Sequence, residues 1–290
     1  MGETPLQGEA GGRARDVPAG RAAPVPARDA ATVAVIRDPV AGDGIEVYLL
    51  RRKASMAFAG ACVFPGGVVD PRDTDDAIAW AGPSPGAWGR VFRTDATTAR
   101  GLVCAAVRET FEESGVLLAG PSAESVVADT AGEDWEADRR ALIGRSLSLA
   151  GLLERRSLVL RSDLLRPWAH WITPESGSRR FDTRFFVALL PAGQRTRDVG
   201  GEADWVTWVR PADAIGQAED GRILLMPPTR RTLVELGGYP TVAAVLAAER
   251  EIVTVMPRGA VVDGGPRAVL GGDRDGRADG GARVGPGEAG

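Results

Sequence analysis

The chain has 290 residues, with 35 basic and 39 acidic side chains and a hydrophobic content of 44%. This is enough apolar material for a buried core, and the net charge of −4 argues against sequence-independent binding of nucleic acid. One His and two Cys are too few for a zinc or haem site, and no run of 18 apolar residues would span a membrane. We therefore expect the chemistry to come from carboxylates, arginines, hydroxyls and backbone groups.

Both ends of the chain are rich in Gly, Pro, Ala, Arg and Asp. Such segments bury too little apolar surface to offset the entropy of ordering, so residues 1–30 and 274–290 are predicted to be disordered tails around a single domain, 31–273. The first tail lacks the apolar run of a secretory signal. Cys62 and Cys104 lie in apolar segments without metal-ligand spacing. These features favour a cytoplasmic protein with two buried, reduced thiols.

The first elements are predicted to be strands. Thr32–Arg37 and Ile45–Arg51 are β-branched and apolar runs, and the turn-rich residues between them suit a hairpin loop. A third short strand, Ala61–Phe64, is followed by the sequence Pro-Gly-Gly. The Gly/Pro-rich stretch at about 74–98 is predicted to be a loop.

A helix is predicted over Ala99–Ser114, closed by Gly115 at the position where a left-handed residue commonly ends a helix. Val103, Val107 and Phe111 recur at i, i+4 and i+8 and would form its buried stripe.

The remaining elements are less regular. Residues 133–154 are predicted to form one or two helices within a helical insertion at about 120–165. Strand character returns at Phe185–Leu190 and Trp205–Val209. Further helices are predicted from Pro228 to Gly237-Gly238 and over Thr241–Glu251. Strands and helices without a regular βαβ rhythm predict an α+β or mixed-sheet α/β sandwich.

Three glutamates share one face of the helix predicted to end at Gly115. Glu109, Glu112 and Glu113 stand at i, i+3 and i+4, where like charges cost a few tenths of a kcal/mol per pair. Several anionic oxygens on a rigid element suit a hard divalent cation, although a solvated acidic helix face is the simpler alternative. The pair Gly66-Gly67 would let a backbone carbonyl approach such a metal.

These residues resemble the signature of the Nudix hydrolases, Gly-x5-Glu-x7-Arg-Glu-U-x-Glu-Glu-x-Gly-U, where U is aliphatic or aromatic. The run Arg108–Val116 is similar to its second half, apart from Thr110 at the first U. Gly67 fits the first Gly, and Asp73 stands where the signature has Glu. Gly67 and Arg108 are 41 positions apart, more than the signature allows. An inserted loop explains the excess, because loop-closure cost grows only slowly with length.

The expanded box resembles the Nudix branch that contains the mammalian peroxisomal acyl-coenzyme A diphosphatase. Similarity to this branch extends over about residues 31–270. The stretches that carry it, besides the box helix, are Phe64–Asp70, Trp171–Pro174, Arg180–Phe186, Gly200–Trp205 and Pro227–Thr229.

The resemblance implies a Nudix fold, in which a mixed sheet is sandwiched between helices. It also implies hydrolysis of a nucleoside diphosphate derivative with Mg²⁺ or Mn²⁺ as cofactor. Glu112, Glu113 and the Gly66 carbonyl would be metal ligands, and Glu109 would bind metal or activate water. Arg108 would hold the glutamates in register.

The expected substrate is coenzyme A or an acyl-coenzyme A, giving adenosine 3′,5′-bisphosphate and (acyl-)4′-phosphopantetheine. Arg51 and Arg52, or Arg180 and Arg184, would bind its phosphates, with ordinary surface charge as the alternative. Glu202 is the candidate for an additional base or ligand, and a plain surface Glu at a strand entry is the alternative.

Two other functions stay open at this point. One is a Nudix diphosphatase for ADP-ribose, NADH or an oxidised nucleotide, and the other is a Nudix-fold binding or regulatory module without turnover. The presence of Arg108 with all three box glutamates favours catalysis. We expect a small-molecule substrate, no nucleic-acid or membrane partner, and leave a homodimer open. His170 is expected to be a packed, hydrogen-bonded imidazole rather than a catalytic one.

Overall fold

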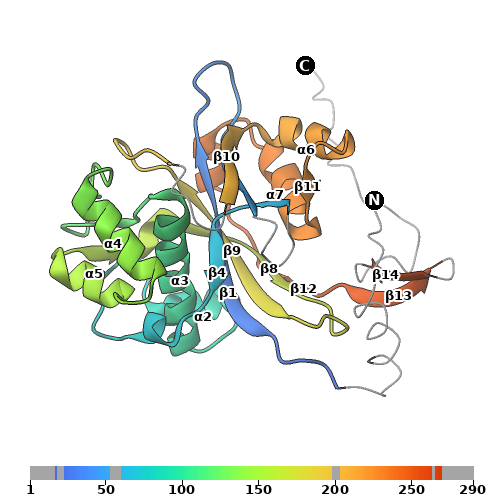
Figure 1. Cartoon of the computed structure of the whole chain (residues 1–290), viewed down its shortest axis with the longest axis horizontal. Coiled ribbons are helices and arrows are strands. Elements are labelled where there is room, and N and C mark those ends of the chain that lie inside the picture. Colours follow the sequence, from blue (N-terminus) through green and yellow to red (C-terminus); the bar gives the residue numbers. More distant parts are fainter. Residues whose placement is uncertain (1–16, 18–22, 53–59, 198–202, 263–264, 270–290) are drawn as a thin grey trace, which may run out of the picture. The chain divides into compact units, whose positions relative to one another are not determined.

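In the computed structural model of the chain, the residues described are 17, 23–52, 60–197, 203–262 and 265–269 (Figure 1). The chain divides into two compact units. The larger unit comprises 26–172 and 181–254, and the smaller one includes 173–180 and the residues from 255 onward. The second predicted tail lies outside the described residues, as do 1–16 and 18–22 of the first, whereas a strand begins at Arg28, inside the predicted first tail.

The larger unit is built on a mixed sheet, as predicted. Its strands follow the order β11-β3-β2-β1-β9-β8, with β4 beside β1 and β10 beside β2. The bounds are β1 Arg28–Arg37, β2 Glu46–Arg52, β3 Ala61–Val63, β4 Gly66–Val68, β8 Leu165–Ile172, β9 Phe181–Leu189, β10 Ala203–Val209 and β11 Leu224–Leu225. The central pair, β1 and β9, runs parallel, whereas β1 pairs antiparallel with both β2 and β4.

Helices cover both faces of this sheet (Figure 1). On one side lie α2 (Pro85–Phe92), α3 (Ala96–Ser114), α4 (Glu133–Ile143) and α5 (Leu149–Arg155). On the other side lie α6 (Pro211–Glu219) and α7 (Pro227–Gly237). Strand β1 is therefore buried along most of its length, which explains why its sequence is a continuous apolar run rather than an alternating one.

The long helix α3 agrees with the prediction at its end and in its core face. Gly115 follows it with a left-handed φ of 75°, and its N–H donates to the Phe111 carbonyl. Val103, Val107 and Phe111 are fully buried, so the predicted stripe is confirmed. The helix begins three residues earlier than predicted, because the Asp95 side chain accepts from the Thr98 N–H and caps it.

The segment at 74–98 is not the loop that its Gly and Pro content predicted. It follows a 3₁₀ turn, η1 (Pro71–Thr74), and contains a short strand, β5 (Trp80–Ala81), the helix α2 and the first residues of α3. Ser84 caps α2, and Pro85 occupies its first turn, where the N–H that proline lacks would have no partner within the helix. Trp88 and Phe92, one helical turn apart, both pack against Phe186 of β9. This aromatic burial outweighs the loop-like composition of the segment.

The predicted helical insertion packs against α3. Its helices α4 and α5 are separate, because Gly144 is followed by Arg145 with a left-handed φ of 59°. A small sheet, β5-β7-β6, joins the insertion to the segment before α3, with β6 at Ala119–Gly120 and β7 at Val159–Arg161. The turn η2, Ser162–Leu164, then leads into β8. Trp135 of α4 meets Phe111 of α3 edge to face at 6.1 Å.

The C-terminal elements differ from the prediction in one helix. Helix α8 covers only Val242–Leu246, although its periodicity predicted a helix to Glu251. Arg250 instead donates to the Trp168 carbonyl and to Glu235, so tertiary contacts end the helix early. The strands β12 (Thr254–Val255), β13 (Arg258–Val262) and β14 (Gly265–Val269) follow, the last two as an antiparallel hairpin in the smaller unit. None of the helices that the structure describes has the length and apolar character needed to cross a membrane.

Candidate functional site

The two halves of the split box meet in the fold. Strand β4 begins at Gly66, whose N–H donates to the Glu113 carboxylate on α3 over 2.8 Å. The neighbouring Gly67 lies directly beside the carboxylate of Glu109. Residues more than 40 positions apart in the sequence therefore share one site, in spite of the segment inserted between them.

Both glycines are required by close approach rather than by an unusual φ angle. A Cβ atom on Gly66 would overlap the Thr32 hydroxyl and the backbone of Ala31 in the adjacent strand β1. A Cβ atom on Gly67 would occupy the position of the Glu109 carboxylate. The backbone of β4 thus fits between a strand and a glutamate: at Gly66 a side chain would meet backbone, whereas at Gly67 it would displace the Glu109 carboxylate.

Arg108 is the centre of an ion-pair network at this site. Its guanidinium binds Asp73 through Nε at 3.0 Å and Nη2 at 3.0 Å, and Nη1 contacts Glu109 at 2.7 Å and Glu112 at 3.2 Å. Nη2 also donates to the Val68 carbonyl at the end of β4. One guanidinium therefore joins the helix, the strand and the turn after it.

Asp73 takes the place of the signature's first Glu. It is 1% exposed, pairs with Arg108, and accepts a hydrogen bond from the Asp70 backbone N–H. Asp70 in turn caps the 3₁₀ turn η1 by accepting from the Arg72 N–H. The shorter Asp side chain reaches Arg108 because this turn brings its backbone close to α3.

Burial and charge act in opposite directions on these groups. Burial raises the pKa of Asp73, and its bonds from Arg108 offset only part of that effect. Burial disfavours the charged form of Arg108, but the Asp73 hydrogen bonds and the Glu109 charge outweigh it and raise the pKa of the guanidinium. The bond from Arg72 holds the pKa of Asp70 well below its usual range. Arg108 therefore stays charged between the carboxylates.

The carboxylates fit a hard cation in their chemistry. In the part of the chain that the structure describes, no three His, Cys, Asp or Glu side chains already converge on a point suited to a metal. Arg108 draws Glu109 and Glu112 toward itself, and the Gly66 amide binds Glu113. A carboxylate accepts several bonds at once, so these contacts do not exclude Mg²⁺ or Mn²⁺, which prefer anionic oxygen ligands.

The four arginines proposed for substrate binding lie in different surroundings. Arg51 and Arg52 end strand β2, where Arg51 is opposite Cys62, four residues before Gly66. Arg184 is buried and its guanidinium pairs with two carboxylates, Asp29 and Asp182. Arg180, in the smaller unit, donates to three backbone carbonyls, those of Val25, Thr173 and Pro174. Glu202 lies outside the described residues.

His170 is packed and hydrogen-bonded and the two cysteines are buried, as expected. The His170 ring is buried between Asp182, which contacts Nε2 at 2.5 Å, and the Thr254 hydroxyl, which contacts Nδ1 at 2.8 Å. Burial raises the pKa of Asp182, but His170 and Arg184 outweigh it and the net shift is downward. Cys62 and Cys104 are both buried and reduced.

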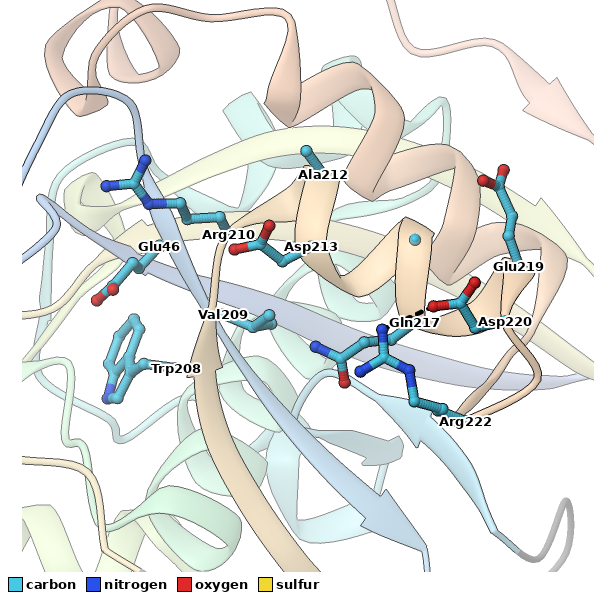
Figure 2. A pocket seen from close by; sticks show the side chains of 11 residues that line it. Glu46, Trp208, Val209, Arg210, Ala212, Asp213, Gln217, Glu219, Asp220 and Arg222 are labelled. Carbon is cyan, nitrogen blue, oxygen red and sulfur yellow. Dashed lines mark hydrogen bonds and ion pairs between the residues drawn. The ribbon is translucent and has the colours of Figure 1, made fainter.

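A separate hollow of about 530 Å³ lies beside α6 and the ends of β2 and β10 (Figure 2). Several of its charged side chains are already paired, Arg222 with Asp220 and Glu46 with Arg37. The described residues that line it include no member of the glutamate cluster. We therefore place the candidate site at β4 and α3 rather than in this hollow.

One residue that contacts the site carries no sequence signal. Arg139 of α4, a single arginine among many, donates to the Glu112 carbonyl over 2.7 Å. Because the contact is made to a backbone atom, no motif or spacing could identify it.

The chain is similar to several known Nudix proteins. The family model of the NUDT19 Nudix domain matches residues 94–236. Putative nudix hydrolase 7 of Caenorhabditis elegans is 29% identical over 191 residues, which are 66% of this chain and 55% of that protein. Acyl-coenzyme A diphosphatase NUDT19 of Xenopus laevis is 27% identical over 217 residues, 63% of this chain and 57% of that protein. The chain thus spans just over half the length of these relatives.

Among solved structures, the crystal structure of a NUDIX hydrolase from Alicyclobacillus acidocaldarius superposes with a TM-score of 0.66. It is 28% identical, and the match covers 78% of this chain and 98% of the other.

Proposed function

We propose, from the resemblance of the chain to the NUDT19 branch of the Nudix hydrolases, that it hydrolyses the diphosphate bond of coenzyme A or an acyl-coenzyme A. The observation that carries the proposal is the closure of the box across its insertion. The Gly66 amide meets Glu113, and Arg108 meets Asp73, so the carboxylates of α3 stand beside β4. This arrangement supports hydrolysis by water rather than by a covalent nucleophile.

The proposed cofactor is Mg²⁺ or Mn²⁺, held by Glu112, Glu113 and the carbonyl of Gly66. When bound, such an ion supplies positive charge for the phosphate oxygens and lowers the pKa of a water molecule. Arg108 keeps Glu109 and Glu112 in place through its two short contacts. These residues provide the negative charge that a hard divalent cation requires.

Glu109 is the proposed base. The oxygen of water bonds to one phosphorus, the bond from that phosphorus to the bridging oxygen breaks, and the proton of the water passes to Glu109. Its side chain is suited to this task because Gly67 and Arg108 confine its carboxylate from two sides. Glu202 stays a proposal for an additional base or ligand.

Coenzyme A is favoured as the substrate by the relatives named acyl-coenzyme A diphosphatase. Its 3′-phosphate needs a cation, and a planar guanidinium binds phosphate through two parallel bonds. Of the four candidate arginines, Arg51 and Arg52 are the pair to test first, because they end β2, which pairs with β3, the strand that leads into the turn before Gly66.

A panel of diphosphates, each assayed with Mg²⁺ and with Mn²⁺, tests the substrate. We expect coenzyme A and acyl-coenzyme A to be cleaved with the highest kcat/KM, and adenosine 3′,5′-bisphosphate to appear as a product. Dephospho-coenzyme A, which lacks the 3′-phosphate, should be about tenfold poorer, because it loses a charge-assisted contact. Cleavage of ADP-ribose or NADH with coenzyme A untouched would overturn this substrate.

Variants of the arginines sharpen the same experiment. Arg51→Gln and Arg52→Gln should reduce the difference in kcat/KM between coenzyme A and dephospho-coenzyme A. Arg222→Gln is the matched control, since Arg222 is an exposed arginine in the hollow beside α6. An unchanged preference in both variants would exclude these two residues from recognition of the 3′-phosphate.

The two box glycines should respond differently to alanine. In Gly67→Ala the new Cβ displaces the Glu109 carboxylate, which is the flexible end of a side chain, so we expect little loss of stability. The rate should nevertheless fall about tenfold or more, because the base is moved from its position. In Gly66→Ala the Cβ meets the backbone of β1, so this variant should lose stability. Initial rates and thermal unfolding check both, and a Gly67→Ala enzyme with the wild-type rate would contradict the placement of Glu109.

A further inference from the structure

The helical insertion places a buried arginine beneath the last turn of α3. Arg139 of α4 is 1% exposed. Its Nη1 donates to the Glu112 carbonyl over 2.7 Å, and its Nε and Nη2 bind the two oxygens of Glu136 at 2.9 and 2.5 Å. The guanidinium is therefore fixed at one end by a carboxylate of its own helix and at the other end by α3.

This contact satisfies a carbonyl that the helix itself leaves without a partner. The last four carbonyls of an α-helix have no N–H donor within the helix to bind them. In α3 the Ser114 carbonyl accepts from the Arg197 N–H, and the Glu112 carbonyl accepts from Arg139. A cation at a helix C-terminus is also stabilised by the helix dipole, most strongly where it is buried.

A second contact joins the insertion to the other half of the box. Arg145, just after α4, lies 3.4 Å from the Asp70 carboxylate, and Arg72 donates to the Arg145 carbonyl over 3.0 Å. Asp70 starts the turn that carries Asp73 to Arg108. The helical insertion thus contacts both halves of the box, the turn after β4 and the helix α3.

We propose that Arg139 is a positioning residue for the metal ligands Glu112 and Glu113, an inference that rests on the proposed function. By fixing the last turn of α3, it sets where the backbone of Glu112 stands relative to β4, which the Gly66–Glu113 bond joins from the other side. The insertion is then part of the metal site, although no residue of it is a ligand.

The test measures metal binding directly. Metal-free wild-type protein and its variants are titrated with Mn²⁺, and the free ion is followed by electron paramagnetic resonance. We expect Arg139→Gln to raise the Kd for Mn²⁺ about tenfold, the change that loss of one charge-assisted hydrogen bond brings. Arg139→Lys keeps the positive charge but lacks the planar guanidinium that binds two partners at once. Its Kd for Mn²⁺ should lie between those of Arg139→Gln and the wild type.

The matched control is Arg156→Gln. Arg156 is also an arginine of the insertion, and it pairs with Asp134 and Asp138 and stacks on Trp135. Its loss should destabilise the insertion while leaving the Kd for Mn²⁺ within about twofold of the wild type. Hydrogen exchange of the amides in the last turn of α3 gives a second readout, and it should speed up in Arg139→Gln only.

The outcomes separate this inference from the function on which it rests. If the wild type binds Mn²⁺ and cleaves coenzyme A while Arg139→Gln and Arg139→Lys bind Mn²⁺ equally well, Arg139 is only structural and the inference fails. If the wild type binds no Mn²⁺, the metal assignment fails together with the inference. Equally weakened Mn²⁺ binding in Arg139→Gln and Arg156→Gln would also overturn the inference, because any loss of stability in the insertion would then be enough to weaken metal binding.

Discussion

Replacing Glu112 and Glu113 together by glutamine should lower the rate of diphosphate hydrolysis by orders of magnitude, about 10³-fold or more, and leave the fold intact. Glutamine has nearly the same shape as glutamate and keeps one carbonyl oxygen. That oxygen can still accept from the Gly66 amide and from Arg108, so the contacts that position α3 persist. The two negative charges are lost, and with them the attraction for a divalent cation.

Steady-state rates with Mg²⁺ and Mn²⁺, together with thermal unfolding, check this expectation. Glu154→Gln is the matched control, because Glu154 is an exposed glutamate at the end of α5. It should keep the wild-type rate. Near wild-type hydrolysis by a folded Glu112→Gln/Glu113→Gln protein would end the assignment of these residues as metal ligands.

Among the substitutions proposed for this site, the removal of Arg108 should lower the free energy of unfolding the most. In Arg108→Met the buried Asp73 carboxylate loses its partner, and Glu109 and Glu112 lose the cation that lies between them. Leaving one member of a buried ion pair uncompensated costs about 3–5 kcal/mol. We therefore expect a loss of this size in the free energy of unfolding, measured with urea at neutral pH.

A second substitution identifies the cause of that loss. In Arg108→Met/Asp73→Asn the buried negative charge is gone, while an Asn oxygen can still accept from the Asp70 amide. The double variant should regain about 1 kcal/mol or more relative to Arg108→Met. Asp73→Asn is measured alone as well. If the losses of stability in Arg108→Met and Asp73→Asn simply add in the double variant, the Asp73 charge is not what destabilises Arg108→Met.

The pH dependence of Arg108→Met has a defined sign. Burial raises the pKa of Asp73 even with Arg108 present, so the neutral form is more favourable in the folded protein than in the unfolded one. A raised folded-state pKa means that the folded state binds protons more tightly than the unfolded one. The stability of Arg108→Met should therefore increase as the pH is lowered from about 7 toward about 4. The double variant, which has no carboxylate at position 73, should lack this increase.

Local signals were sufficient for several elements of the fold. The end of α3 at Gly115 and its buried stripe follow from helix periodicity and from the ease with which glycine adopts a left-handed φ. The mixed sheet follows from apolar runs separated by turn residues. The family resemblance depended on the short run Arg108–Val116, because its residue types and spacing are specific even where the box is split.

Long-range contacts decided what composition could not. Residues 85–92 have the glycine and proline content of a loop, yet Trp88 and Phe92 form a helix there because β9 offers Phe186 to bury them. Helix α8 ends early for the converse reason, since Arg250 binds Trp168 and Glu235 instead of continuing the helix. In both places the tertiary partner lies far away in the sequence, so no local window contains the information.

The candidate site divides in the same way. The residue types of the site can be read directly from the sequence: three glutamates on one helical face, an arginine before them, and a glycine pair upstream. The folded chain shows in addition that the turn η1 brings Asp73 to Arg108, that the glycines fit between Thr32 and Glu109, and that Arg139 binds the Glu112 carbonyl. These contacts are not readable from the sequence, because side-chain chemistry is encoded at single positions. A backbone hydrogen bond or a steric fit depends on two segments whose approach is set by the packing of the whole unit.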